Sequence, residues 1–335
     1  MTDHKEATRL VLQYAPEIPL WVQLPLYKEE GMIPQFVDGL PGLDDTDGKT
    51  HINTTRADFE DSLLAFYDAY VAVTEGGTDV SDSLFAMTDK TARGFFALLD
   101  ELKTRDTRPQ AVKGQITGPI TMGTGLANQD DRAVFYDDQL RDAMLKLIAM
   151  KAKWQTRMLK QTGCPVIMFF DEPALAGYGS SAFLSISKED ILNAFTEVMA
   201  PVHDEGGLTG VHVCANTDWS LVLDSPADIV SFDAFSYADN FILYPDLIRK
   251  FIDRGGILAW GIVPTSAEDL AGVTLEPLVA KWKDDFQKIV DLGIPEETLM
   301  AQSLITPSCG TGSLSLEEAT KVLTLTREVS LAVRK

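Results

Sequence analysis

The strongest constraint on the fold is an alternation that begins near residue 110. Short runs of almost unbroken apolar residues alternate there with longer amphipathic segments. Unbroken apolar runs are typical of parallel strands buried on both faces, and amphipathic segments are typical of the helices that cover them. The strand-like runs lie at 112–118, 165–171, 208–214, 229–235, 257–263 and 299–306. The alternation therefore predicts an α/β protein with a parallel sheet.

The N-terminal third adds two weaker strand patterns, at 18–26 and near 83–87, and a helical pattern at 57–73. The total is about eight β/α units, with no linker rich in Pro, Gly or Ser between them. This count predicts a single (β/α)8 TIM barrel that forms one domain over residues 1–335. An open doubly wound sheet is the alternative, but the chain lacks a glycine-rich nucleotide-binding fingerprint.

Helix boundaries are also visible in the sequence. A long helical pattern at 132–162 is followed by Gly163, which predicts a C-terminal stop. Three further helices are predicted to begin at capping boxes. The pairs are Ser187 with Asp190, Thr265 with Glu268, and Ser315 with Glu318.

The segment at about 27–55 is long, polar and rich in Gly, Pro and Asp. A loop of this length is usually functional or mobile. It follows the first predicted strand, so it would lie at the same end of a barrel as the other strand-to-helix loops. A lid over that end and a plain surface insertion both fit the pattern.

Composition excludes several classes of protein. With 50 acidic and 29 basic residues, the net charge of −21 argues against a nucleic-acid-binding protein, which needs a basic surface. The acidity serves solubility, or it provides a rim for a basic protein partner. No apolar run approaches the roughly 20 residues of a membrane helix, and the N-terminus lacks a signal-peptide pattern. We therefore expect a cytoplasmic protein that does not act at a membrane.

Two of the three cysteines are placed where a catalytic zinc ion needs ligands. His212 and Cys214 close one predicted strand, and Cys309 follows another. Residues i and i+2 of a strand point to the same side, so the histidine and the first cysteine share one face. One imidazole and two thiolates leave a tetrahedral zinc with one open position, as in catalytic sites that activate a bound nucleophile.

The alternative for these residues is a structural zinc site. Such sites usually draw on cysteine pairs close in sequence, whereas these ligands lie almost a hundred residues apart. The remaining cysteine, Cys164, begins the run at 165–171 and is predicted to be a small buried apolar side chain. An odd, low cysteine count also argues against a disulfide framework.

Other reactive side chains fall at the ends of predicted strands. In TIM barrels, the functional groups come from the C-terminal ends of the strands. The candidates there are Asp171 and Glu172 after one strand, Asp233 near the end of another, and Lys113, Gln115 and Thr117, which we expect to bind substrate, along a third. We therefore expect these groups to share one rim with the histidine and the cysteines.

Four motifs together resemble a known family. They are Lys-Gly-Gln-Ile-Thr-Gly-Pro at 113–119, Asp-Glu-Pro-Ala-Leu at 171–175, His-Val-Cys at 212–214 and Pro-Ser-Cys-Gly at 307–310. In this order they resemble the catalytic barrel of cobalamin-independent methionine synthase, over about residues 110–335. The wider superfamily includes uroporphyrinogen decarboxylase and the corrinoid-dependent thiol methyltransferases. The resemblance implies zinc-dependent transfer of a methyl group to a thiol, with homocysteine giving methionine as the first expectation.

The resemblance also implies roles for individual residues. His212, Cys214 and Cys309 would hold zinc, and Asp233 stands where the family has a ligating Glu. A structural hydrogen bond is the alternative role for Asp233. Asp171 would bind the amino group of homocysteine, or instead orient a zinc ligand. Glu172 is a further catalytic candidate beside Asp171.

The chain departs from the family pattern in ways that bear on the methyl donor. We expect no second barrel to help bind methyl-folate, because 335 residues leave no room for one, and the stretch at 260–265 lacks the histidine expected near the leaving group. His51 in the long loop is the candidate substitute, and Gln23 lies where the family contacts homocysteine. The chain is thus similar to short core methionine synthases, which implies a methylated corrinoid protein as donor.

Three other functions remain open. The thiol could be a different one, such as coenzyme M. A metal-free decarboxylase of the porphyrinogen type would need a basic cluster for substrate carboxylates, which the N-terminal part of this chain does not have. The barrel could also be a zinc-binding or corrinoid-partner protein without catalytic activity.

Overall fold

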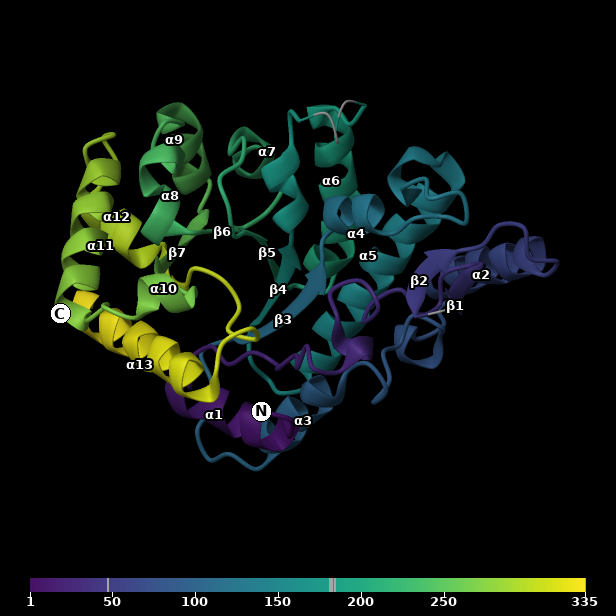
Figure 1. Cartoon of the computed structure of the whole chain (residues 1–335), viewed down its shortest axis with the longest axis horizontal. Coiled ribbons are helices and arrows are strands. Elements are labelled where there is room, and N and C mark those ends of the chain that lie inside the picture. The colour runs from purple at the N-terminus through teal and green to yellow at the C-terminus, as the bar shows by residue number, and fades with distance from the viewer. Residues whose placement is uncertain (47, 181–182, 184, 335) are drawn as a thin grey trace.

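The computed structural model describes residues 1–46, 48–180, 183 and 185–334. Its centre is a parallel sheet in the order β3-β4-β5-β6-β7-β8, which curls into a half-barrel (Figure 1). The strands are β3 (Val112–Thr117), β4 (Val166–Asp171), β5 (Leu208–Val213), β6 (Ile229–Phe232), β7 (Ile257–Val263) and β8 (Ser303–Pro307). Each predicted run from residue 110 onward therefore contains a strand. The last strand starts later than predicted, because residues 299–301 belong to a helix.

Helices follow the strands and cover the convex face of the sheet (Figure 1). They are α4 (Pro119–Gly125), α5 (Asp138–Lys160), α6 (Lys188–Asp204), α7 (Ser220–Leu223), α8 (Ala234–Phe241), α9 (Pro245–Asp253), α10 (Ala267–Leu270), α11 (Leu275–Val290), α12 (Glu296–Ala301) and α13 (Leu316–Val333). Short 3-10 turns lie at η3 (Val134–Tyr136) and η4 (Pro173–Gly177). Apolar side chains from the convex face and from these helices form the main core.

The N-terminal part adds elements outside the sheet. They are α1 (His4–Tyr14), η1 (Lys28–Glu30), β1 (Leu43–Thr46), β2 (Lys49–Ile52), α2 (Phe59–Thr74), η2 (Val80–Asp82) and α3 (Arg93–Lys103). In Figure 1, α13, α1 and α3 complete the ring of helices along the lower edge of the molecule. The guanidinium of Arg327 on α13 donates to the carbonyl of Gln13 on α1, so the two ends of the chain are in contact.

The six-stranded half-barrel is consistent with a TIM-like fold, but the residues described do not show the eight strands of the predicted barrel. The segment after α1 makes only a single parallel bridge, between Leu20 and Lys113, and Pro19 and Pro25 limit its hydrogen bonding because proline has no N–H. Residues 83–87 form turns instead of a strand. The Ser83 hydroxyl donates to the Val80 carbonyl at 2.7 Å, a local bond that competes with strand pairing. The sheet therefore covers about half of a barrel.

Two of the three predicted capping boxes are confirmed. Ser187 and Ser315 each accept a hydrogen bond from the third backbone N–H of the helix, and the acidic partner bonds back. The third was wrong by one residue, since Ser266 caps α10 and the Thr265 hydroxyl pairs with Ser308 at 3.1 Å. Gly163 follows α5 with φ of 74°, a left-handed conformation that glycine adopts without strain.

The segment at 27–55 contains structure that the sequence analysis did not predict. It holds η1 and the antiparallel hairpin β1–β2. The hairpin packs on the loop after α4, where the Ile52 N–H donates to the Ala127 carbonyl at 2.9 Å. Movement of this segment as a lid stays a prediction.

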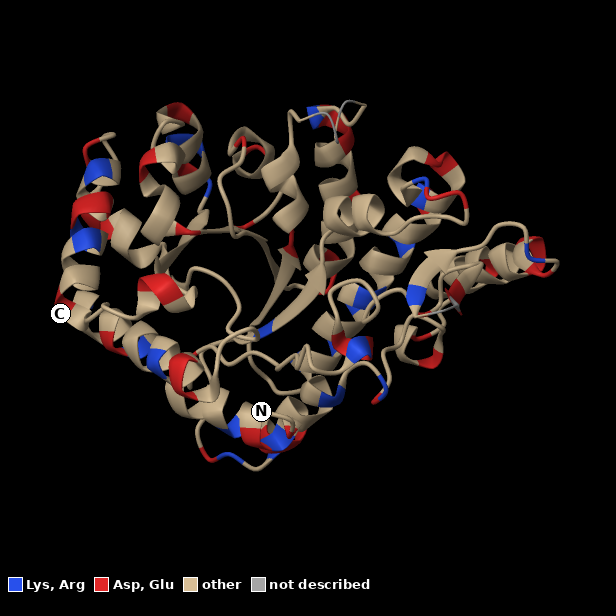
Figure 2. Ribbon diagram, viewed as in Figure 1, with Lys and Arg blue, Asp and Glu red and all other residues tan. Residues whose placement is uncertain are grey.

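Two further properties concern the molecular surface. No helix within the described part of the chain combines the length and apolar character needed to cross a bilayer. Figure 2 shows acidic and basic residues interspersed along the outer helices.

Candidate functional site

The concave face of the sheet is built in rows that follow the strand register. Gln115, Phe169, Gly210 and Ile229 are aligned in one row. Thr117, Asp171, His212 and Ser231 form the next row toward the C-terminal ends of the strands. Buried apolar residues, Phe169 among them, make a small separate core on this face. The concave face therefore changes from apolar to polar along the strands, and its polar row lies at the end where barrel enzymes place their sites.

Three potential metal ligands meet at this end. His212 and Cys214 come from the end of β5, and Cys309 comes from the loop after β8. Each residue offers one ligand atom, and the three atoms all lie within 4.8 Å of one another. A tetrahedral zinc with these ligands would need separations of about 3.5–4 Å, given bond lengths near 2.0 and 2.3 Å. The spacing is thus compatible with one shared ion after small side-chain movements.

The two sulfur atoms share a hydrogen bond. This bond from the Cys214 thiol, followed by a second from His212, holds the pKa of Cys309 well below its usual range. The same bond to Cys309, with burial as the second cause, raises the pKa of Cys214. The shared hydrogen bond therefore favours the thiolate form of Cys309. Two cysteine sulfurs next to an imidazole are a donor set suited to zinc.

Ser231 orients the imidazole. Its hydroxyl lies 3.0 Å from Nδ1 of His212, and the side chain is buried in the row beside the histidine. A proton on Nδ1 would be donated to this hydroxyl, which leaves the Nε2 lone pair available to a metal. The sequence analysis missed this residue. The sequence feature that could have identified Ser231 is its position two residues before Asp233, because residues two apart in a strand point to the same side.

Asp233 lies outside the group of three close ligands. Its carboxylate caps α8, where Oδ1 accepts a hydrogen bond from the Ser236 N–H at 2.9 Å. Burial raises the pKa of this carboxyl, and the hydrogen bonds from Ser236 oppose the shift. The observed role is the structural hydrogen bond considered as the alternative, and zinc ligation by Asp233 stays a prediction.

Asp171 ends β4 directly beside His212 in the register. Burial raises its pKa, while the charges of Lys113 and His212 lower it. Within the described residues, no protein group donates a hydrogen bond to its carboxylate. The carboxylate is therefore available for a ligand, as the predicted contact with an amino group requires.

Glu172 is fully buried and is used as a helix cap. Its carboxylate accepts hydrogen bonds from the backbone N–H groups of Ile120 and Thr121, both at 2.8 Å, and from the Thr121 hydroxyl at 2.6 Å. Burial raises the pKa of Glu172 to about 7 against the effect of these donors. The carboxylate joins the connections after β3 and β4, and its catalytic role stays a prediction.

Three predicted substrate-binding side chains are engaged with the N-terminal segment. The Thr117 hydroxyl donates to the Met32 carbonyl at 2.6 Å. The Gln115 amide donates to the Trp21 carbonyl at 2.8 Å and to the Gln23 side chain at 3.2 Å. Oε1 of Gln115 is one of five buried side-chain atoms that have no hydrogen-bond partner in the part of the chain described. These bonds attach the segment after α1 to β3, and a direct role with substrate stays a prediction.

The remaining two candidates lie apart from each other. Lys113 is on the concave face, with Nζ 4.6 Å from the centroid of the Phe169 ring. His51 is on β2, and its Nδ1 lies 3.2 Å from the Lys49 carbonyl oxygen. In Figure 1 the hairpin lies to one side of the molecule, away from β5. The structure thus brings Lys113, but not His51, to the face that carries the thiols.

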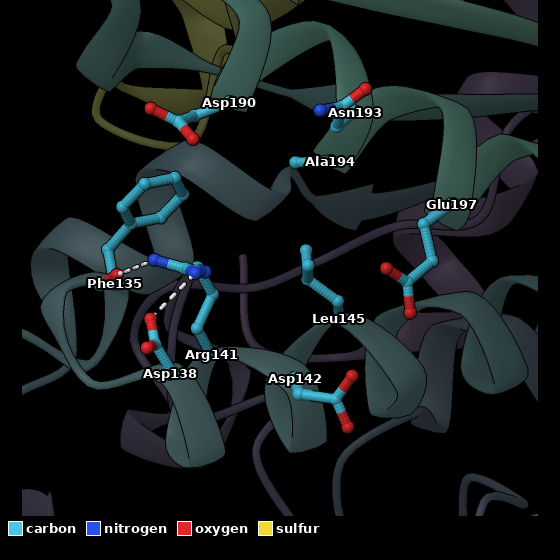
Figure 3. A pocket seen from close by; sticks show the side chains of 9 residues that line it. All are labelled: Phe135, Asp138, Arg141, Asp142, Leu145, Asp190, Asn193, Ala194 and Glu197. Carbon is cyan, nitrogen blue, oxygen red and sulfur yellow. Dashed lines mark hydrogen bonds and ion pairs between the residues drawn. The ribbon is translucent and has the colours of Figure 1, made fainter. Parts of the chain in front are cut away.

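A cavity of about 270 Å³ lies elsewhere, between η3, α5 and α6 (Figure 3). None of the predicted site residues lines it. Its acids have partners, such as Arg141 for Asp138 and Lys146 for both Asp142 and Glu197. The acidic side chains in this cavity are therefore already paired within the protein, and the cavity is a surface feature of the helical layer.

Comparison with known proteins gives a match in structure only. No family model and no curated protein matches the sequence. Among solved structures, a methyltransferase from Methanosarcina mazei matches with a TM-score of 0.54 and 14% identity, over 97% of this chain and 84% of that chain. At this identity, the comparison establishes that the chain shares the fold of that methyltransferase.

Proposed function

We propose that this protein is a methyltransferase that transfers a methyl group to a thiol at a zinc site formed by His212, Cys214 and Cys309. The observation that carries the proposal is the convergence of these three ligand atoms within 4.8 Å, although Cys309 is distant in sequence. The fold shared with a methyltransferase supports the reaction class. When bound, zinc would lower the pKa of an incoming thiol and so supply a thiolate nucleophile at neutral pH.

The residues around the cluster would prepare the reaction. Ser231 would hold the His212 ring in the tautomer with a free Nε2 lone pair. Asp171, whose carboxylate has no donor within the described structure, would bind the ammonium group of an amino-acid thiol. Homocysteine is therefore the proposed substrate and methionine the proposed product. Holding the sulfur in line with the methyl group would contribute several kcal/mol to lowering the barrier.

The proposed methyl donor is a methylated corrinoid protein. A carbon–sulfur bond would form as the carbon–cobalt bond breaks, with the electron pair of the broken bond left on cobalt. The proton of the thiol would be released to solvent. The acidic surface, with a net charge of −21, would favour a donor protein that presents a basic face.

The first test is metal retention in two cysteine variants. We expect about one zinc per chain in the wild-type protein, and loss of zinc and a more than 100-fold loss of turnover in Cys309→Ala, because a ligand is removed. Cys164→Ala is the matched control, since Cys164 is buried away from the cluster and should cost only about 1–2 kcal/mol of stability. Equal loss of activity in both variants would contradict the assignment.

The second test is the reaction itself. The zinc-loaded protein is incubated with methylcobalamin and a panel of thiols that includes homocysteine and coenzyme M, and the spectrum of the demethylated corrinoid is followed. We expect turnover with homocysteine. Turnover with none of the thiols, either with methylcobalamin or with methyl-folate, would refute the proposed function.

A further inference from the structure

Lys113 is the exceptional charge on the concave face. It lies on β3 in line with Gln115 and Thr117, and its ammonium group lies over the ring of Phe169 at 4.6 Å. Burial lowers its pKa, and the negative charge of Asp171 opposes that shift. Within the described part of the chain, the ammonium group of Lys113 forms no hydrogen bond or ion pair, and its contact is the Phe169 ring. The side chain is half-buried. An ammonium group that is partly shielded from water and has no charged partner would be stabilised by a bound anion.

The position of this ammonium group matches the depth of a small ligand. The Phe169 row is two residues below the row of Asp171 and His212, which corresponds to about 7 Å along a strand. The ammonium group therefore lies below the row of His212 by about the length of a thiol that carries a charged group two or three carbons from sulfur. Phe169 and Ile229, the apolar side chains of the lower row, would contact the carbon atoms between the two ends.

We infer that Lys113 binds the anionic group of the thiol substrate, so that this site selects short thiols that carry a carboxylate or a sulfonate. This inference rests on the proposed function, because it assumes that the sulfur binds at His212, Cys214 and Cys309. Asp171 lies beside the ligand path and would add selectivity for a thiol that also has an ammonium group. A neutral thiol of the same length would leave Lys113 without a partner.

The test measures thiol binding directly instead of turnover. The full-length protein is loaded with cobalt(II) in place of zinc, and thiols are titrated while the sulfur-to-cobalt absorption is followed. Two matched pairs are used: 3-mercaptopropionate with 3-mercaptopropanamide, and 2-mercaptoethanesulfonate with 2-mercaptoethanol. We expect the wild-type protein to bind the anionic member of each pair about 10- to 100-fold more tightly.

Variants then assign this preference to one residue. Lys113→Met should bring the affinity ratio to within about threefold of one, and Lys113→Arg should keep a ratio above ten. Lys151→Met is the matched control, because Lys151 is a buried lysine that lies on α5, on the convex side of the sheet. It should keep the wild-type ratio. Comparing ratios between proteins cancels the intrinsic acidity of each thiol.

The outcomes separate the two claims. If no thiol changes the cobalt spectrum, the proposed function fails. If thiols bind but the wild-type protein does not prefer the anionic members, or Lys113→Met keeps the preference, the inference about Lys113 is overturned. If Lys113→Met does not fold, Lys113→Gln takes its place, and the same comparison with the wild-type affinity ratio tests the inference.

Discussion

The contact between His212 and Ser231 is the residue-scale feature that most directly prepares a metal site. A histidine ligand binds through one ring nitrogen, and the partner of the other nitrogen sets the tautomer and the ring orientation. Here the partner is a buried hydroxyl at 3.0 Å on the neighbouring strand. The hydrogen bond between Cys214 and Cys309 prepares the sulfurs in a similar way, because it favours a thiolate on one of them.

Ser231→Ala should weaken metal binding about 10- to 100-fold, because the imidazole loses the group that orients it. The measurement is zinc transfer to a chelator of known affinity. Ser231→Thr keeps a hydroxyl and should restore most of the affinity. Ser225→Ala removes another buried serine hydroxyl, which lies before the start of β6 and donates to the Val222 carbonyl, and should leave zinc affinity unchanged. Wild-type affinity in Ser231→Ala would refute the orienting role.

At the scale of elements, two strand-to-helix connections depend on each other. Gly118 precedes α4, and a Cβ atom there would lie 2.4 Å from the carboxyl group of Glu172, which follows β4. The glycine is required by this close approach and not by its backbone angles, since its φ is −70°. The space it leaves allows the carboxylate to cap the first turn of α4.

Gly118→Ala should lower the free energy of unfolding by about 2–4 kcal/mol, because the added methyl group would displace the Glu172 carboxylate from its donors. Urea denaturation measures this change. Gly272→Ala is the control, since no atom lies within 4 Å of the added Cβ and φ is not positive there. It should change stability by less than about 0.5 kcal/mol. Similar effects in the two variants would contradict the steric explanation.

At the scale of the whole molecule, buried acids make stability depend on pH. Burial raises the pKa values of Asp171, Glu172 and Asp233, all at one end of the sheet. A carboxyl with a raised pKa binds its proton more tightly in the folded state than in the unfolded state. Its contribution is therefore fully present below the unfolded pKa and is lost as pH rises through the folded pKa.

For Glu172 the window runs from an ordinary pKa of 4.5 to about 7, which corresponds to about 3 kcal/mol. We expect the stability of the wild-type protein to fall between pH 5 and pH 8, and to fall by about 3 kcal/mol less in Glu172→Gln. Urea denaturation at pH 5, 6, 7 and 8 measures both curves. The variant will be less stable at pH 5, because its amide cannot accept all three hydrogen bonds. Parallel curves would show that Glu172 does not titrate in this range.

The sequence by itself determined the local structure of this protein. The apolar runs located the six strands of the sheet, and the spacing of His212 and Cys214 predicted a shared face. Ser187 and Ser315 marked the starts of helices. These features depend on residue period and on hydrogen bonds between near neighbours, so they can be read from a short window.

Only the tertiary structure decided how the strands and ligands meet. The curl of the sheet and the path after β8 bring Cys309 to Cys214, and the register places Ser231 beside His212. The same long-range arrangement makes Asp233 and Glu172 helix caps, and it leaves residues 18–26 with one bridge in place of a strand. The physical reason is that register, curl and closure depend on packing between segments distant in sequence, which no local pattern encodes.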